Sequence, residues 1–208
     1  MELLLFGSIA YLLGSIPSAV WIGKVWHDVD VREHGSKNAG ATNTFRVLGK
    51  NAGITVLLID ITKGFLAVYL PVLVFLNSKE LSNAELIHTQ IICAILAVLG
   101  HVFPLFANFK GGKGVATSLG VIIGIHPASA GICLVLFLII FIITKYVSFG
   151  AICAAIMFPF LQVYLFEATD FWLILFSVIL SCAVIIAHKK NIGRLLKGEE
   201  SKMNLFRK

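Results

Sequence analysis

Long apolar runs separated by short polar segments dominate the pattern of hydrophobic and polar positions along this chain. Apolar runs of about 18 residues or more predict helices that cross a membrane. Seven candidate runs are present, at residues 3–22, 53–76, 86–106, 115–125, 128–144, 149–166 and 171–187. We therefore predict an all-α polytopic membrane protein with seven transmembrane helices, built as a single domain over residues 1–208.

The fourth run is short for a membrane span. At about 1.5 Å per residue, the helix 115–125 crosses only part of a hydrocarbon core of about 30 Å. It can lie in a thinned region of the bilayer or share a hinge at Pro127 with the next helix. The distribution of basic residues favours counting it as a crossing, because without it the loops at Lys79 and Lys145 would lie on the wrong sides.

Basic residues are divided unequally between the two sides. If the amino terminus lies outside, all of the 17 lysines and arginines except Lys79 fall on the inner side. Because cytoplasmic loops of membrane proteins are rich in lysine and arginine, we predict an external N-terminus and a cytoplasmic C-terminus. The longest polar connections also lie on this inner side, where any chemistry in water would take place.

Composition agrees with a membrane protein. Hydrophobic residues make up 58% of the chain and charged residues 13%, whereas a soluble domain carries about a quarter charged residues. We therefore expect the net charge of +6 to attract lipid head groups and phosphate rather than nucleic acid. The four cysteines lie within apolar runs, and no metal-binding motif is present, so we expect neither a metal nor a cofactor.

The segment 110–114, Lys-Gly-Gly-Lys-Gly, joins two apolar runs. Glycines let backbone N–H groups approach an anion, and the start of a helix directs further N–H groups at it. The segment is not a nucleotide P-loop, since Lys113 is followed by Gly114 rather than by Ser or Thr. Three glycines beside a lysine exceed what positive-inside anchoring requires, so we favour phosphate binding.

The segment 35–46 offers hydroxyl, amide and cationic side chains. Arg46 is the residue type best suited to a bidentate grip on phosphate. A solvated, turn-rich loop explains the same residues equally well and stays open as the alternative. The polar candidates in the segment are Ser36, Asn38, Thr42, Asn43 and Arg46.

Other polar residues have simpler structural explanations when each is judged alone. Ser148 is predicted to be an N-cap. His188 and Asn191 would share one face of the last helix near its inner end. Asp60 and Lys63 are spaced to pair with each other inside the second run.

Several of these segments resemble those of a known enzyme family. The chain is similar to the acyl-phosphate-dependent glycerol-3-phosphate acyltransferases in five segments that occur in the same order and with matching spacing. Lys37 stands where members of the family often have glycine. The five segments are Gly-Ser-Ile-Pro at 14–17, the segment 35–46, Asp-Ile-Thr-Lys-Gly at 60–64, the stretch 100–117 and the tail 188–200.

The resemblance implies a multi-pass enzyme of the bacterial plasma (inner) membrane with its active site facing the cytoplasm. It would move a fatty acyl group from acyl phosphate to the 1-hydroxyl of sn-glycerol 3-phosphate, giving lysophosphatidic acid and phosphate. Its partners would be these two substrates and membrane lipid. No obligate protein partner is expected, which is consistent with a monomer.

On this interpretation, Lys113 and the N–H groups of Gly111, Gly112 and Gly114 hold the acyl phosphate, with Lys110 beside them. Arg46 and Ser36, with Asn38, Thr42 and Asn43 nearby, hold glycerol 3-phosphate. The resemblance also implies that His188, Asn191 and Ser148 complete the pocket. Two alternatives of other classes are a small transporter of an anionic phosphorylated metabolite and a lipid-binding scaffold.

Overall fold

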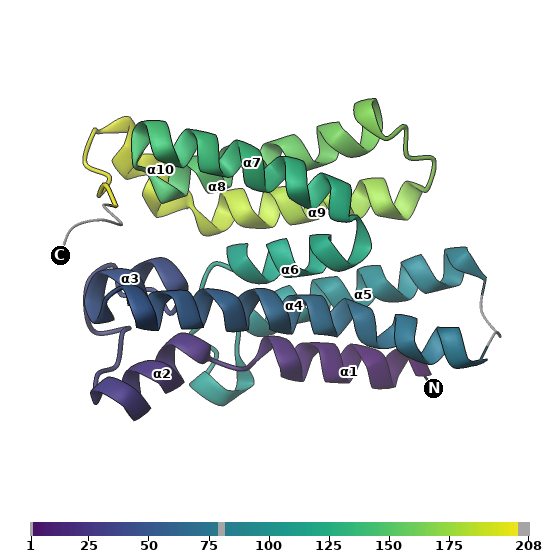
Figure 1. The fold of residues 1–208 in the computed structure, drawn as a ribbon, viewed down its shortest axis with the longest axis horizontal. Coiled ribbons are helices and arrows are strands. Elements are labelled where there is room, and N and C mark those ends of the chain that lie inside the picture. The colour runs from purple at the N-terminus through teal and green to yellow at the C-terminus, as the bar shows by residue number, and fades with distance from the viewer. Residues whose placement is uncertain (1, 79–81, 204–208) are drawn as a thin grey trace. The chain divides into compact units, whose positions relative to one another are not determined.

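The computed structural model describes residues 2–78 and 82–203 (Figure 1). Within this described part, all regular structure is helical, which confirms the predicted fold class. Lys79, on which the orientation argument drew, lies outside the described residues. The chain divides into two compact units, Met1–Ile125 and His126–Lys208.

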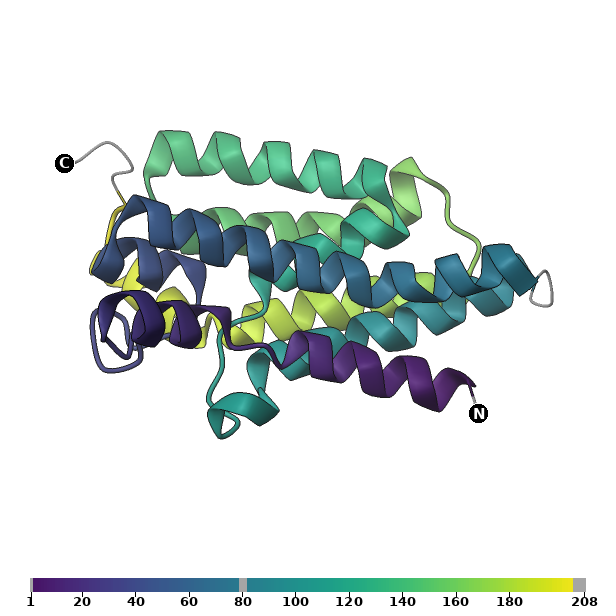
Figure 2. The ribbon, with the colours of Figure 1, turned by 60° about the horizontal axis from the view of Figure 1, so that its bottom comes forward.

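The first unit is a bundle in which α4 packs against α1, α5 and α6. Helix α1 also packs along α5, and the short helices α2 and α3 pack against α4 and each other. Figure 2 shows α1, α4 and α5 running along one common direction. Its elements are α1 (Glu2–Gly14), α2 (Ser18–His27), α3 (Ala41–Leu48), α4 (Lys50–Ser78), α5 (Asn83–Val102), the 3-10 helix η1 (Leu105–Ala107) and α6 (Val115–Ile125).

The first predicted run is broken into two helices at Pro17. Proline has no N–H and cannot continue the hydrogen-bond ladder, so α1 ends at Gly14 and α2 begins at Ser18. The break frees the carbonyl of Ile16, which accepts a hydrogen bond from Lys63 Nζ at 2.8 Å. Gly14 lies against the backbone of Ala97, where an added Cβ would collide. Pro17 thus breaks the first run, and Gly14 lets α1 pack closely against α5.

The second unit packs α8 against α7 and α9, with the short helix α10 against α8 and α9. Pro127 occupies the first turn of α7, and His126 caps that helix by accepting the N–H of Ser129 at 3.2 Å. The elements are α7 (Pro127–Thr144), α8 (Val147–Phe160), the π-helix η2 (Leu161–Leu165), α9 (Phe171–Ala187) and α10 (Lys189–Leu196).

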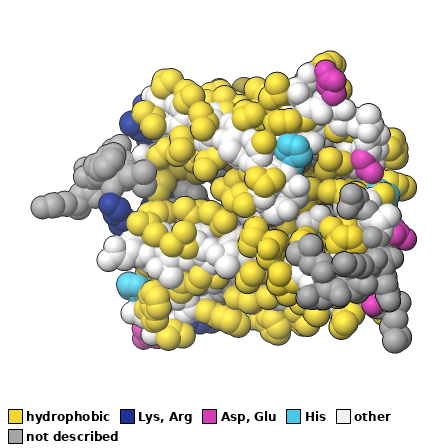
Figure 3. All heavy atoms as spheres, turned by 45° about the vertical axis from the view of Figure 1, so that its right-hand side comes forward, with side chains coloured by type: hydrophobic (Ala, Val, Ile, Leu, Met, Phe, Trp, Pro, Cys, Tyr) yellow, Lys and Arg dark blue, Asp and Glu magenta, His cyan; other side chains and the backbone are white. Residues whose placement is uncertain are grey.

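Five helical segments of the described chain are long and apolar enough to cross a membrane, and a sixth is reached if α9 and α10, bent by 60°, form one span. Helix α6 has 11 residues, fewer than the 18 that a candidate membrane span needs. The seven-span count therefore stays a prediction. Hydrophobic side chains cover most of the face drawn in Figure 3, as a lipid-facing surface requires.

Candidate functional site

The glycine loop, defined here as residues 110–114, leaves the end of α5 through η1 and enters α6. The N–H of Gly111 donates to the carbonyl of Val102 and the N–H of Gly112 to the carbonyl of His101, both at 3.2 Å. In this conformation both N–H groups already bind the end of α5, so the expectation that they hold a phosphate stays a prediction. An added Cβ on Gly111 or Gly112 would collide with His101, so these glycines permit close packing of the loop.

Backbone donors for an anion lie instead at the first turn of α6. Gly114 enters the helix with φ of +77°, a conformation that glycine adopts without strain. The first intrahelical bond runs from the N–H of Ser118 to the carbonyl of Gly114 at 2.7 Å. The N–H groups before Ser118 have no carbonyl partner within the helix. They lie next to the half-buried Lys113, so positive charge and helix dipole coincide there.

The segment 35–46 forms a turn followed by α3, and Asn43 holds that turn together. Its Oδ1 accepts the N–H of Ser36 at 2.8 Å, and its Nδ2 donates to the carbonyls of Val31 and His34 at 2.7 and 3.1 Å. Asn43 is fully buried. We predicted Asn43 as a substrate-binding residue, but all of these amide contacts are internal, so its observed role is to fix the loop.

The other polar side chains of this segment are more accessible. Ser36 and Arg46 are exposed, whereas Asn38 and Thr42 are half-buried. Within the described residues, Arg46 makes no ion pair or side-chain hydrogen bond. Lys37 has φ of +59°, in the left-handed region that glycine favours.

The two phosphate-binding candidates meet in the first unit. The carbonyl oxygen of Ala39 lies 2.9 Å from the place that a Cβ on Gly112 would occupy. Arg32, which precedes the 35–46 segment, makes a nearby link, since its guanidinium donates to the carbonyl of Ala107 in η1 at 3.1 Å. The hydrogen bond from Arg32 holds the pKa of Asp30 well below its ordinary range. The structure therefore brings the 35–46 segment and the glycine loop together.

In the second unit, Glu200 gathers three polar side chains. Its Oε1 accepts hydrogen bonds from Ser148 Oγ and Asn191 Nδ2, and its Oε2 accepts one from Arg194 Nε, each at 2.6 Å. Burial would raise the pKa of Glu200, but these three donors outweigh it and hold the pKa below its ordinary value. The predicted N-cap role of Ser148 is wrong, because Tyr146 occupies that position and Ser148 lies inside α8.

His188 lies at the bend between α9 and α10. We expected His188 and Asn191 on one face of a continuous helix, but α9 ends at Ala187 and α10 begins at Lys189. His188 Nδ1 lies 2.8 Å from the carbonyl oxygen of Val184. That contact requires the proton on Nδ1, so the neutral ring carries its lone pair on Nε2.

Sequence reasoning missed three residues that organise these regions. Glu200 binds Ser148, which is 52 positions away, and nothing in the local pattern distinguishes it from Glu199. Ser18 and Thr117 have small hydroxyl side chains that the sequence analysis did not single out. Their partners, Asp60 and His101, lie on other helices. The one available signal was Asp60 itself, because a charged residue inside an apolar run indicates a polar neighbour.

A family model described as glycerol-3-phosphate acyltransferase matches residues 4–198. The chain is 43% identical over 203 residues to a glycerol-3-phosphate acyltransferase of Fusobacterium nucleatum, covering 97% of this chain and 98% of that one. It is 41% identical over 223 residues to one from Chlorobaculum tepidum, covering 96% of each.

Two solved structures are also similar. Both are crystal structures of PlsY (YgiH), an integral membrane glycerol 3-phosphate acyltransferase, and both are 36% identical to this chain. The glycerol 3-phosphate form matches with a TM-score of 0.86 and covers 100% of each chain. The lysophosphatidic acid form matches with a TM-score of 0.82 over 99% of this chain and 97% of that one. The chain therefore belongs to the glycerol-3-phosphate acyltransferase family and is an integral membrane acyltransferase.

Proposed function

We propose that this protein transfers a fatty acyl group from acyl phosphate to the 1-hydroxyl of sn-glycerol 3-phosphate. The products are lysophosphatidic acid and inorganic phosphate, so the reaction is the first acyl step of bacterial phospholipid synthesis. The observation that carries the proposal is the meeting of the 35–46 segment with the glycine loop at Ala39 and Gly112. Cationic side chains and helix N–H groups there suit two phosphorylated substrates.

Glycerol 3-phosphate as the acceptor is supported by the names of the relatives and by the glycerol 3-phosphate form of the 36% identical structure. Lysophosphatidic acid as the product is supported by the second form. Acyl phosphate as the donor is implied by the resemblance of the five sequence segments, and its chemistry fits. It is a mixed anhydride with a good leaving group, so positioning and charge stabilisation suffice for the transfer.

The residues divide between the two substrates. Lys113, with the first-turn N–H groups of α6 and Lys110 nearby, holds the phosphate of the donor and stabilises the charge that develops as it leaves. Arg46 and Ser36 hold the phosphate of the acceptor, with Asn38 and Thr42 beside them. The acceptor hydroxyl then attacks the acyl carbonyl, and the bond between that carbonyl and the phosphate oxygen breaks.

Two routes remain for the proton of the attacking hydroxyl. A phosphate oxygen of a substrate can accept it, or Nε2 of His188 can act as the base. The pH–rate profile of His188→Gln separates the routes. Loss of the pH dependence that reports a titrating base supports the histidine, whereas a uniform and shallow loss of rate supports the substrate. Asn191 and Ser148 are proposed to act in the same reaction.

The donor is tested with purified protein in detergent or in a lipidic mesophase. Palmitoyl phosphate plus glycerol 3-phosphate should release inorganic phosphate and yield lysophosphatidic acid in equal amounts. Palmitoyl-CoA and palmitoyl acyl carrier protein, offered under the same conditions, should yield none. Product formation from either thioester without palmitoyl phosphate would refute the proposed donor.

The proposed setting is the bacterial plasma membrane. The chain would cross it seven times as one domain, with α6 as the short crossing, the N-terminus outside and the C-terminus and active site facing the cytoplasm. A cysteine introduced at Ser36 or Ser201 of a cysteine-free variant should react with a membrane-impermeant maleimide in inside-out vesicles. Reaction in right-side-out vesicles instead would refute the orientation.

A further inference from the structure

A cluster of buried polar side chains lies behind the glycine loop in the first unit. Ser18 Oγ donates to Asp60 Oδ1 at 2.7 Å, and Lys63 Nζ pairs with the same oxygen at 2.8 Å. His101 Nδ1 lies 3.6 Å from that oxygen and 3.1 Å from Thr117 Oγ1. Each of the five side chains is at most 6% exposed. Helices α2 and α5 therefore meet α4 at one carboxylate, and α6 joins them through the contact of Thr117 with His101.

The ion pair between Asp60 and Lys63 explains only part of this cluster. Both residues lie on α4, so their charges are compensated without help from α5 or α6. His101 and Thr117 are additional polar groups, and burying polar groups is unfavourable unless they serve a specific contact. What distinguishes them is their place in the chain, because His101 lies in the last turn of α5 and Thr117 in the first turn of α6. These are the two ends between which the glycine loop is held.

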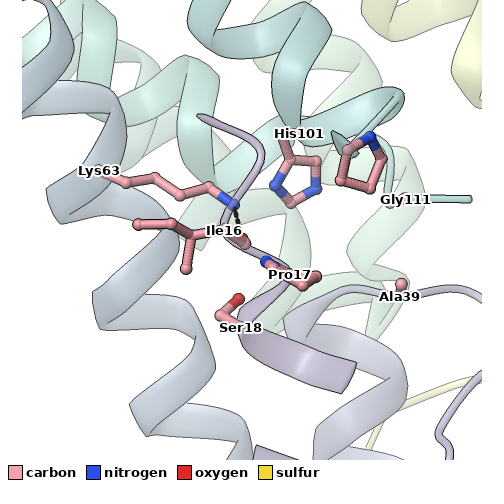
Figure 4. Close-up of a pocket in the computed structure, with 8 residues that line it drawn as sticks. Ile16, Pro17, Ser18, Ala39, Lys63, His101 and Gly111 are labelled. Carbon is pink, nitrogen blue, oxygen red and sulfur yellow. Dashed lines mark hydrogen bonds between the residues drawn. The ribbon is translucent and has the colours of Figure 1, made fainter. Parts of the chain in front are cut away.

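The loop also rests directly on His101. The carbonyl of His101 accepts the N–H of Gly112, and a Cβ on Gly112 would collide with Nε2 of the ring. The ring, Lys63, Ala39 and Gly111 are among the residues that line a small cavity, which Figure 4 shows. Its volume is about 10 Å³, which is about the room that a single water needs. Because the loop packs directly against the backbone and the ring of His101, a displacement of His101 would shift the loop.

We propose that His101 is a positioning residue for phosphate binding. Its Nδ1 forms a hydrogen bond with the hydroxyl of Thr117 and lies near the carboxylate of Asp60, and so fixes the glycine loop and the first turn of α6 relative to α4. The inference rests on the proposed role of the loop in binding a substrate phosphate. The atom that makes this link is Nδ1, since Nε2 lies on the side of Gly112.

Two pairs of substitutions test this atom by atom. The side-chain amide of asparagine places a polar atom at the position of Nδ1, whereas that of glutamine extends to the position of Nε2. His101→Asn should therefore recover function that His101→Gln does not. Similarly, Thr117→Ser keeps the hydroxyl and Thr117→Val replaces it with a methyl group of nearly the same size. His88→Gln, on α5 but outside the cluster, is the matched control.

The measurement is kcat and the KM of each substrate, made on protein that elutes as a folded species and has its Tm recorded. His101→Gln and Thr117→Val should raise the KM of a phosphorylated substrate about tenfold or more, because small displacements of binding groups have large effects. His101→Asn, Thr117→Ser and His88→Gln should change it far less.

The inference is overturned if folded His101→Gln and Thr117→Val keep the wild-type KM values, or if Asn and Gln at position 101 are equally impaired. A lower Tm with unchanged KM in all variants would show a purely structural role and overturn it too. Wild-type protein without turnover on acyl phosphate and glycerol 3-phosphate would instead refute the proposed function itself.

Discussion

The buried pair of Asp60 and Lys63 offers a stringent test of how the first unit is stabilised. The two side chains are 1% and 3% exposed and lie 2.8 Å apart. Removing one partner of such a pair leaves an uncompensated charge, which costs about 3–5 kcal/mol. We therefore expect Asp60→Leu and Lys63→Met each to lower the free energy of unfolding by about that amount.

The double variant should be much less impaired than the two single variants together. With both charges removed, the remaining cost comes mainly from the hydroxyl of Ser18, which loses its carboxylate partner. The carbonyl of Ile16 loses Lys63 but still accepts the N–H of Ser18 at 3.0 Å. An unsatisfied buried polar group costs about 1–3 kcal/mol. The double variant should thus lose about 1–3 kcal/mol, against about 6–10 kcal/mol for the sum of the single variants.

The assay is equilibrium unfolding of the purified protein in detergent, followed by its tryptophan fluorescence. Lys24→Met is the control, because the ion pair between Lys24 and Asp30 is 3.4 Å long and Lys24 is 57% exposed, so its loss should cost less than about 1 kcal/mol. Effects of Asp60→Leu and Lys63→Met that add within about 0.5 kcal/mol would refute the reasoning, since additivity indicates sites that do not interact.

Three further predictions concern the loops and the tail. Lys113→Ala should abolish nearly all turnover while the protein stays folded, as phosphate release and thermal unfolding will show; wild-type rates would remove Lys113 from the site. Asn43→Ala should lower stability by about 3 kcal/mol in unfolding measurements, because three hydrogen bonds to the backbone are lost; an unchanged stability would mean that water replaces the amide. The depressed pKa of Glu200 means that its ionised form stabilises the fold. That stability is present above the pKa of the unfolded state, about 4.3, and is lost as the pH falls through the folded-state pKa. The Tm of Glu200→Gln should therefore fall less steeply than that of the wild type as the pH is lowered. The same fall of Tm in both proteins would contradict a stabilising role of ionised Glu200.

The sequence was most informative where local chemistry decides the structure. The bounds of α6 and α9 agree with the predicted runs, because Gly114 and His126 flank the first and Asp170 and His188 the second. Pro17 accounts for the break in the first run, since proline cannot continue the helical hydrogen bonds. The pairing of Asp60 with Lys63 followed from their spacing on one helix, and the structure confirms it.

Contacts between distant parts of the chain could not be predicted from the sequence. The spacing of His188 and Asn191 predicts one continuous helix face, yet the chain bends by 60° at that point. The composition of the glycine loop suggests free N–H donors, but those of Gly111 and Gly112 bind the end of α5. Whether a donor is engaged depends on which carbonyls the tertiary fold brings close, and this information is absent from a local pattern.

The role of the 35–46 segment was only partly accessible. Its residue types indicated a phosphate site and a turn-rich loop equally well. In the structure Asn43 builds the turn, while Arg46 and Ser36 stay exposed and are the residues to which the phosphate-binding prediction still applies. The division depends on burial, which follows from the packing of α3 against α4.

The most direct test of the account is the location of a bound substrate. A crystal structure of this protein grown in a lipidic mesophase with glycerol 3-phosphate should show the phosphate in contact with Arg46, at the surface where the 35–46 segment meets the glycine loop. Titration calorimetry of Arg46→Ala should show the corresponding loss of binding. A phosphate at the opposite end of the helices, or one distant from both Arg46 and Lys113, would contradict the account.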